Sequence, residues 1–211
     1  MEKIIHTFTG GADGAGGSAG SPIVDGGRVY GLCTAGGANA AGNVFELAPT
    51  PRGESKETVL YAFKDEPDSG FPYGSLAGDG HGNLYGTTYY AGANDVGTIY
   101  RLSRVGGVWT ETWLYSFKGG PDGDGPISSL AADASGNLYG TTSDGGSPRC
   151  NCGTIFKVVP AGTPAYSVLY RFPGQPGPGF AYNGWSPTAQ AQCSTAPRYT
   201  AAPGTKARFV N

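Results

Sequence analysis

The stretch Gly82-Asn-Leu-Tyr-Gly-Thr-Thr88 decides the fold, because the same heptapeptide returns as Gly136-Asn-Leu-Tyr-Gly-Thr-Thr142. A weaker copy, Val29-Tyr-Gly31, is followed by Leu-Cys where the other copies have Thr-Thr. The glycines of the three copies are 55 and then 54 residues apart. A fixed interval of about this length is the signature of a repeat architecture.

Two further motifs return with the same period. One is a short apolar block that ends in phenylalanine, and the other resembles Gly-Thr-Ile-Phe-Lys-Val. Their landmarks are Phe8, Phe63, Phe117 and Phe172 for the first motif, and Gly42, Gly97 and Gly153 for the second. The shared period predicts repeats at about 10–63, 64–117 and 118–172, within a repeat domain spanning 1–182.

Strand signals dominate each repeat. Val59, Tyr61 and Phe63 alternate with Leu60 and Ala62, and a period of two places one set on the buried face of a sheet. No segment has helical spacing. Glycine in the middle of a strand marks a bulge or a close backbone approach, so the glycine of Leu-Tyr-Gly-Thr-Thr is expected to line a narrow central channel.

A further short strand is expected in each repeat, at Ser75–Ala77 and Ser129–Ala131. The turns that follow, 79–83 and 133–137, are rich in Asp, Gly and Asn, residues that favour tight turns.

Four short strands in about 54 residues correspond to one blade of a β-propeller. We therefore predict an all-β, β-propeller-like fold with three complete four-stranded blades and an incomplete fourth. A two-sheet sandwich is the alternative, although sandwiches do not require motifs at one fixed interval. Residues 3–8 are expected to form the last strand of a blade, and ring closure would need a fourth blade from 173–211.

The motifs resemble the bacterial GloVer tandem repeat, over roughly residues 4–182. The blocks 83–88, 137–142, 97–102 and 153–158 carry the resemblance. It implies a propeller-like repeat of a large exported or surface-anchored protein, with no established activity. The chain differs from that family by its few repeats, its degraded first copy and its lack of a leader, so a fragment of an extracellular or cell-surface parent is expected.

Composition excludes several classes of protein. The chain of 211 residues contains 38 Gly and 16 Pro, but its 13 Tyr, 9 Phe and 3 Trp and its net charge of −2 argue against disorder. The balance of charges predicts no nucleic-acid or anionic-lipid partner. No stretch is apolar enough to span a membrane, and the start, Met1–His6, does not resemble a signal peptide.

The sequence predicts no catalytic and no cofactor-binding residue, and therefore no cofactor. Asp122 and Asp124 are weak candidates for calcium, because alternate carboxylates in a glycine loop can face one cation, but the further acidic ligands of a calcium loop are absent and a polar turn is the preferred explanation. His6 and His81 occupy unrelated repeat positions, and His6 stands where other copies have tyrosine. Neither histidine has a partner motif.

The four cysteines do not have zinc spacing. Cys150 and Cys152 are separated by one residue, and Cys33 and Cys193 are distant. Similar loops in the GloVer repeat family hold cysteines. The resemblance therefore implies loop disulfides in an oxidising compartment. A free exposed pair is the alternative.

Two classes of function stay open. The preferred one is a non-catalytic repeat module of a secreted or surface protein, whose partner is a glycan or another protein. Exposed tyrosines such as Tyr89 and Tyr90 suit stacking on sugar rings, although rim packing is the simpler explanation. The alternative is a propeller enzyme acting on polysaccharide. It would need converging carboxylates about 5–9.5 Å apart, whereas those of Asp79, Asp133, Asp122 and Asp124 are expected in outer turns.

The segment 183–211 breaks the repeat although the period demands another copy. A shifted reading frame from Gln192 onward permits Leu-Tyr-Gly-Thr-Thr at the expected position, with a slip near Asn183 to Trp185. The tail is therefore predicted to be an out-of-frame fourth repeat, and a Pro/Ala-rich linker is the alternative.

Overall fold

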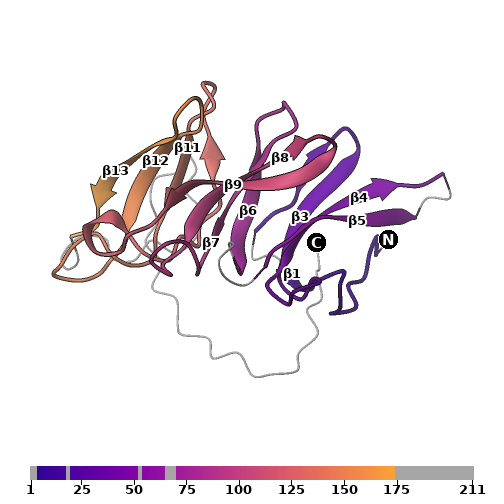
Figure 1. Ribbon diagram of the computed structural model, residues 1–211, viewed down its shortest axis with the longest axis horizontal. Coiled ribbons are helices and arrows are strands. Elements are labelled where there is room, and N and C mark those ends of the chain that lie inside the picture. The colour runs from indigo at the N-terminus through magenta and orange to yellow at the C-terminus, as the bar shows by residue number, and fades with distance from the viewer. Residues whose placement is uncertain (1–3, 18–19, 52–53, 65–69, 174–211) are drawn as a thin grey trace.

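A computed structural model describes residues 4–17, 20–51, 54–64 and 70–173. Three antiparallel sheets stand side by side along the molecule (Figure 1). The predicted all-β repeat fold is confirmed, its three sheets are consistent with propeller-like blades, and they form no closed barrel. The tail 183–211, its proposed frame slip and Cys193 lie outside the described residues. No helix in the described part of the chain is long and apolar enough to cross a membrane.

Each repeat contributes one sheet, and the strands follow one another in chain order. The first sheet contains β1 (Ala15–Gly17), β2 (Ile23–Asp25), β3 (Arg28–Ala35), β4 (Asn43–Pro49) and β5 (Ser55–Ala62). The second contains β6 (Pro72–Gly78), β7 (Leu84–Thr88), β8 (Thr98–Val105) and β9 (Val108–Ser116). A short 3-10 helix, η1 (Gly120–Asp122), precedes β10 (Ala131–Ala132), β11 (Leu138–Thr141), β12 (Thr154–Val159) and β13 (Ala165–Arg171). Because β1 and β2 both pair with β3, they act as two pieces of one first strand.

The repeated glycine does not line a channel, which corrects the expectation from the sequence. Gly86 pairs directly with Tyr100 on β8, and a Cβ on that glycine would lie 2.5 Å from Tyr100 Cζ. Gly140 leaves the same space for the ring of Phe156. The glycine is therefore required because an aromatic ring lies across it. Close backbone approach occurs instead at Gly74 of β6, where a Cβ would meet the neighbouring sheet 2.7 Å away at the Ser128 carbonyl.

The hydrophobic core lies in three seams: the first is between residues 4–9 and the first sheet, the second is between the first and second sheets, and the third is between the second and third sheets. Phe63, at the end of the first sheet, is fully buried against Tyr100 of the second, with ring centroids 5.2 Å apart. Phe117 packs in the same way on Phe156 of the third sheet, at 5.4 Å. The phenylalanines that mark the period thus join each blade to the next.

In the last strand of each sheet, the side chains do not alternate regularly between the two faces. The pairing skips Leu60, Leu114 and Leu169, so each strand carries a β-bulge at a leucine. As a result Leu114 is buried, whereas Trp113 remains 37% exposed. The alternation predicted the strand correctly but did not reveal the bulge.

Residues 4–9 form no strand, contrary to the prediction that 3–8 end a blade. A last strand needs a neighbouring strand of its own sheet, and the described residues supply none on that side. Phe8 nevertheless packs on Phe45, with ring centroids 4.9 Å apart, as Phe63 packs on Tyr100. The segment therefore occupies the seam position without the strand pairing.

Candidate functional site

Four aromatic residues gather at one end of the second sheet, and we call them the aromatic cluster: Phe71, Tyr73, Tyr89 and Tyr90. Phe71 and Tyr73 lie at the start of β6, and the two other tyrosines follow β7. The rings of Tyr89 and Tyr90 meet edge to face with centroids 4.4 Å apart. Tyr90 is 51% exposed, and Phe71 and Tyr73 are also exposed.

The first and third repeats do not have aromatic residues at these positions. The third repeat has Gly125, Ile127, Ser143 and Asp144, and the first has Gly16, Ser18, Thr34 and Ala35. Because the same framework forms without aromatic residues there, the fold does not require the aromatic cluster.

Phe71 also has an unfavourable backbone conformation. Its φ is 54°, close to the 58° of Gly16 and the 59° of Gly125 at the equivalent positions. A residue with a Cβ is disfavoured in this region by about 1–2 kcal/mol, whereas glycine is not. A large aromatic residue at a glycine position is therefore a reason to look for function.

Backbone contacts hold the cluster in place. The Phe71 N–H donates to the Ala41 carbonyl of the first repeat, and the Tyr89 N–H donates to the Phe71 carbonyl. On the other side, Gly125 leaves room for Tyr89, since a Cβ there would lie 2.8 Å from its ring. The aromatic cluster is anchored in its own sheet and against both neighbours.

A second surface with aromatic residues lies between β5 and β9. It is an open groove of about 490 Å³, lined by Tyr61, Lys64, Trp109, Thr110, Glu111 and Trp113. The Tyr61 hydroxyl donates to Glu111 Oε2 across the seam, at 3.1 Å. The groove belongs to the repeated framework, because Tyr61 and Glu111 continue a contact position found at each described seam.

The turn carboxylates are used within their own hairpins. Asp79 accepts hydrogen bonds from the backbone of His81, from Asn83 and from the Tyr85 hydroxyl. Burial alone would raise the Asp79 pKa, but these hydrogen bonds outweigh it and lower the pKa. Asp133 has the same set of bonds, led by the Asn137 side chain, and its pKa falls to about 2. Both turns join the first and second strands of their sheets.

Asp122 and Asp124 have separate partners. The Asp122 carboxylate accepts from the Tyr115 hydroxyl at 2.7 Å and from the Lys118 N–H at 2.9 Å. Asp124 exchanges backbone hydrogen bonds with Asp144, and burial together with the Asp144 charge raises its pKa. A calcium ion between Asp122 and Asp124 stays a prediction.

The histidines occupy different surroundings. His81 lies in the exposed β6–β7 turn. His6 lies in the first seam, where its Nε2 is 3.2 Å from Glu57 Oε2. The sequence placed His6 at a tyrosine position, but it did not reveal the acidic neighbour, which comes from a strand about fifty residues later.

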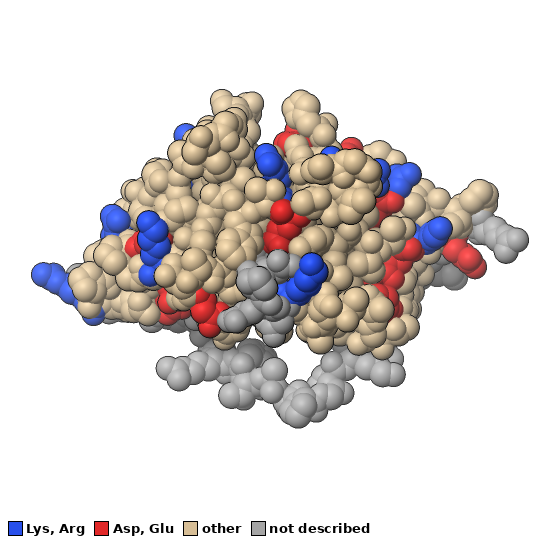
Figure 2. All heavy atoms as spheres, viewed as in Figure 1, with Lys and Arg blue, Asp and Glu red and all other residues tan. Residues whose placement is uncertain are grey.

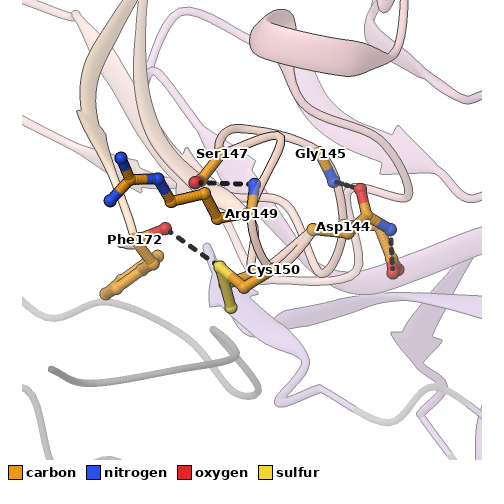
Figure 3. The surroundings of a disulfide bond; sticks show 8 residues. Asp144, Gly145, Ser147, Arg149, Cys150 and Phe172 are labelled. Carbon is orange, nitrogen blue, oxygen red and sulfur yellow. Dashed lines mark hydrogen bonds between the residues drawn. A yellow bond between two sulfur atoms is a disulfide. The ribbon is translucent and has the colours of Figure 1, made fainter. Parts of the chain in front are cut away.

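Cys150 and Cys152 form a disulfide in the loop between β11 and β12, as the resemblance implied (Figure 3). Cys150 also points toward the Phe172 carbonyl, with its Sγ 3.4 Å from that oxygen. In the earlier repeats, Asn39 and Asn94 donate to the carbonyls of Phe63 and Phe117. The disulfide thus replaces an asparagine that closes this loop. Cys33 is a buried free thiol, and burial raises its pKa to about 12.

Charge is sparse on the molecular surface. Figure 2 shows a face on which acidic and basic side chains are scattered among residues that are neither.

A family model for the Gloeobacter/Verrucomicrobia repeat matches residues 2–192. The chain belongs to this repeat family, as its motifs indicated, and is a repeat module of unknown function. A search among curated proteins finds no match.

Proposed function

We propose that the chain is a non-catalytic binding module, and that the aromatic cluster binds the sugar rings of a neutral glycan. The observation that carries the proposal is Phe71, a large aromatic residue at a left-handed position where the first and third repeats have glycine. The strain and the exposed apolar surface serve no purpose in the shared framework.

The chemistry of the cluster supports a sugar as the ligand. A sugar ring presents apolar C–H groups on its face and hydroxyls at its edge. Aromatic faces cover the C–H groups, and tyrosine hydroxyls form hydrogen bonds with the sugar hydroxyls. Phe71 and Tyr90 meet at 87° between their ring planes, and Tyr89 and Tyr90 meet at 83°. The rings therefore face different directions and suit a ligand that bends around them.

The test compares the cluster with the third repeat. A variant carrying F71G, Y73I, Y89S and Y90D has the residues of that repeat at all four positions, so it retains a sequence that the framework tolerates. We expect the native chain to bind glycans on an array and in calorimetry, and the variant to lose at least tenfold in affinity, about 1.4 kcal/mol.

Trp113→Ala is the matched control, because Trp113 is 37% exposed, as is Tyr73, but lies in the β5–β9 groove. Its affinity is expected to be unchanged. Loss of binding in the Trp113 variant alone would move the site to the groove. Turnover of a polysaccharide that disappears on replacing Asp124 or Asp144 would replace the binding proposal with the enzyme alternative.

We also propose that the parent protein is extracellular or displayed on the cell surface. The Cys150–Cys152 disulfide supports this location, because such bonds persist in oxidising compartments. Alkylation of thiols in unreduced cells followed by mass spectrometry tests it. Labelling of both cysteines would contradict the location, whereas protection of both until reduction is the expected result.

A further inference from the structure

Each described seam uses the same two positions of the repeat, but with different chemistry. In the second seam Tyr61 donates to Glu111. In the third, Tyr115 stacks on Tyr166 with ring centroids 3.8 Å apart. The first seam has His6 and Glu57 at these positions, with Nε2 and Oε2 3.2 Å apart.

An aspartate completes this arrangement. In the third seam Asp122 accepts from the Tyr115 hydroxyl and the Lys118 N–H, and its carbonyl accepts from the Tyr166 hydroxyl. Asp13 occupies the equivalent position in the first repeat. It accepts from the N–H and the hydroxyl of Thr9, both at 2.7 Å.

The polar groups satisfy one another in the third seam, but not in the first. His6 Nε2 and Glu57 Oε1 are both buried and have no hydrogen-bond partner, although Nε2 lies 3.2 Å from Glu57 Oε2. Buried polar atoms without partners are rare in folded proteins and call for an explanation such as an ion.

One ligand atom from each of His6, Asp13 and Glu57 lies within 4.8 Å of the others. Two ligands at about 2.0–2.2 Å from one zinc ion are at most about 4.4 Å apart, so a small side-chain rotation closes the site. An imidazole with two carboxylates is a ligand set for borderline divalent metals. The hydrogen bonds from Thr9 hold the Asp13 carboxylate in place, as is usual around metal ligands.

We infer that His6, Asp13 and Glu57 bind a divalent transition metal, of which zinc is the representative, with water completing the coordination. The ion joins the N-terminal segment to the last strand of the first sheet. It does so where residues 4–9 have no strand pairing to hold them.

The experiment uses the full chain with its disulfide intact. Zinc is titrated by calorimetry, and cobalt is added as a spectroscopic probe. We expect one ion per chain, a melting temperature that rises with zinc, and a cobalt spectrum of nitrogen and oxygen ligands. Loss of a group that merely supports a ligand weakens metal binding about 10–100-fold, so loss of a ligand itself is expected to weaken it at least as much.

His6→Tyr is the decisive variant, because it installs the Tyr–Glu pair that the second seam already uses. It should fold but bind zinc at least 10-fold more weakly, and Glu57→Gln should also bind weakly. His81→Gln, which changes the exposed turn histidine, should bind as the native chain does. Undiminished zinc binding by His6→Tyr, no binding by the native chain, or a thiolate-to-cobalt band that reveals cysteine ligation would each overturn the inference.

Discussion

The second and third sheets share one framework but differ at one end. The Leu-Tyr-Gly-Thr-Thr strand, the ring across its glycine and the aspartate turn agree in both repeats. At the loop end, however, the second sheet has the aromatic cluster, and the third has Gly125, Ile127, Ser143 and Asp144. The comparison separates residues that make a blade from residues that a blade merely carries.

The largest expected effect tests whether the framework is shared. Gly86→Ala and Gly140→Ala each place a methyl group 2.5 Å from a buried aromatic carbon, on Tyr100 and Phe156 respectively. Neither ring has room to move, so each variant should lose about 2–3 kcal/mol of unfolding free energy in urea titrations. A loss at only one of the two glycines would show that the two sheets are packed by different rules.

Replacing Tyr100 sharpens the comparison within the core. The Tyr100 ring is fully buried and its hydroxyl has no hydrogen-bond partner, whereas Phe45 and Phe156 occupy the equivalent positions. Because an unsatisfied buried polar group is destabilising by about 1–3 kcal/mol, Tyr100→Phe is expected to stabilise the chain by about 1 kcal/mol. A higher melting temperature is the expected measurement. A destabilised variant would mean that the hydroxyl has a role in the second sheet that the other repeats lack.

The aspartate turns of the second and third sheets are expected to make the free energy of unfolding depend on pH. Hydrogen bonds, first of all from Asn137, lower the Asp133 pKa from 3.8 to about 2. A depressed pKa stabilises the fold above the unfolded value, and this stability is lost as the pH falls from about 4 toward 2. Asp133→Asn should therefore make the unfolding free energy less dependent on pH in that window. Asp79→Asn should do the same in the second sheet, and an unchanged slope in both would contradict the shared role.

The smallest stability effect is expected at Phe71. Phe71→Gly introduces the residue of the first and third repeats at φ 54° and relieves strain, but it also removes the contact with Tyr90 and makes the unfolded chain more flexible. These effects nearly cancel, so the unfolding free energy should change by less than about 1 kcal/mol. Glycan binding should nevertheless weaken. A large loss of stability would show that Phe71 supports the fold and would remove it as evidence of function.

Periodicity predicted the repeats and the sheets because the same strand-forming and turn-forming residues return in each blade. It could not predict the ring across Gly86, since that contact depends on the register with β8, nor the bulge at Leu114, which the alternation conceals. The Tyr89–Tyr90 pair indicated part of the aromatic cluster. The sequence concealed Phe71, whose significance lies in its backbone angle, and Glu57, which the fold brings to His6. The out-of-frame origin of 183–211 stays a prediction that the codons of the gene will test.

The seams have an evolutionary consequence. Phe63 meets Tyr100 in one seam and Phe117 meets Phe156 in the next, so every blade presents the same pair of faces to its neighbours. If recombination removed residues 64–117, Phe63 would meet Phe156 and the new junction would resemble the two that were lost. Genes for such chains can therefore gain or lose whole blades by unequal crossing-over without inventing an interface. A deletion that is not a whole number of repeats would instead place unlike surfaces together.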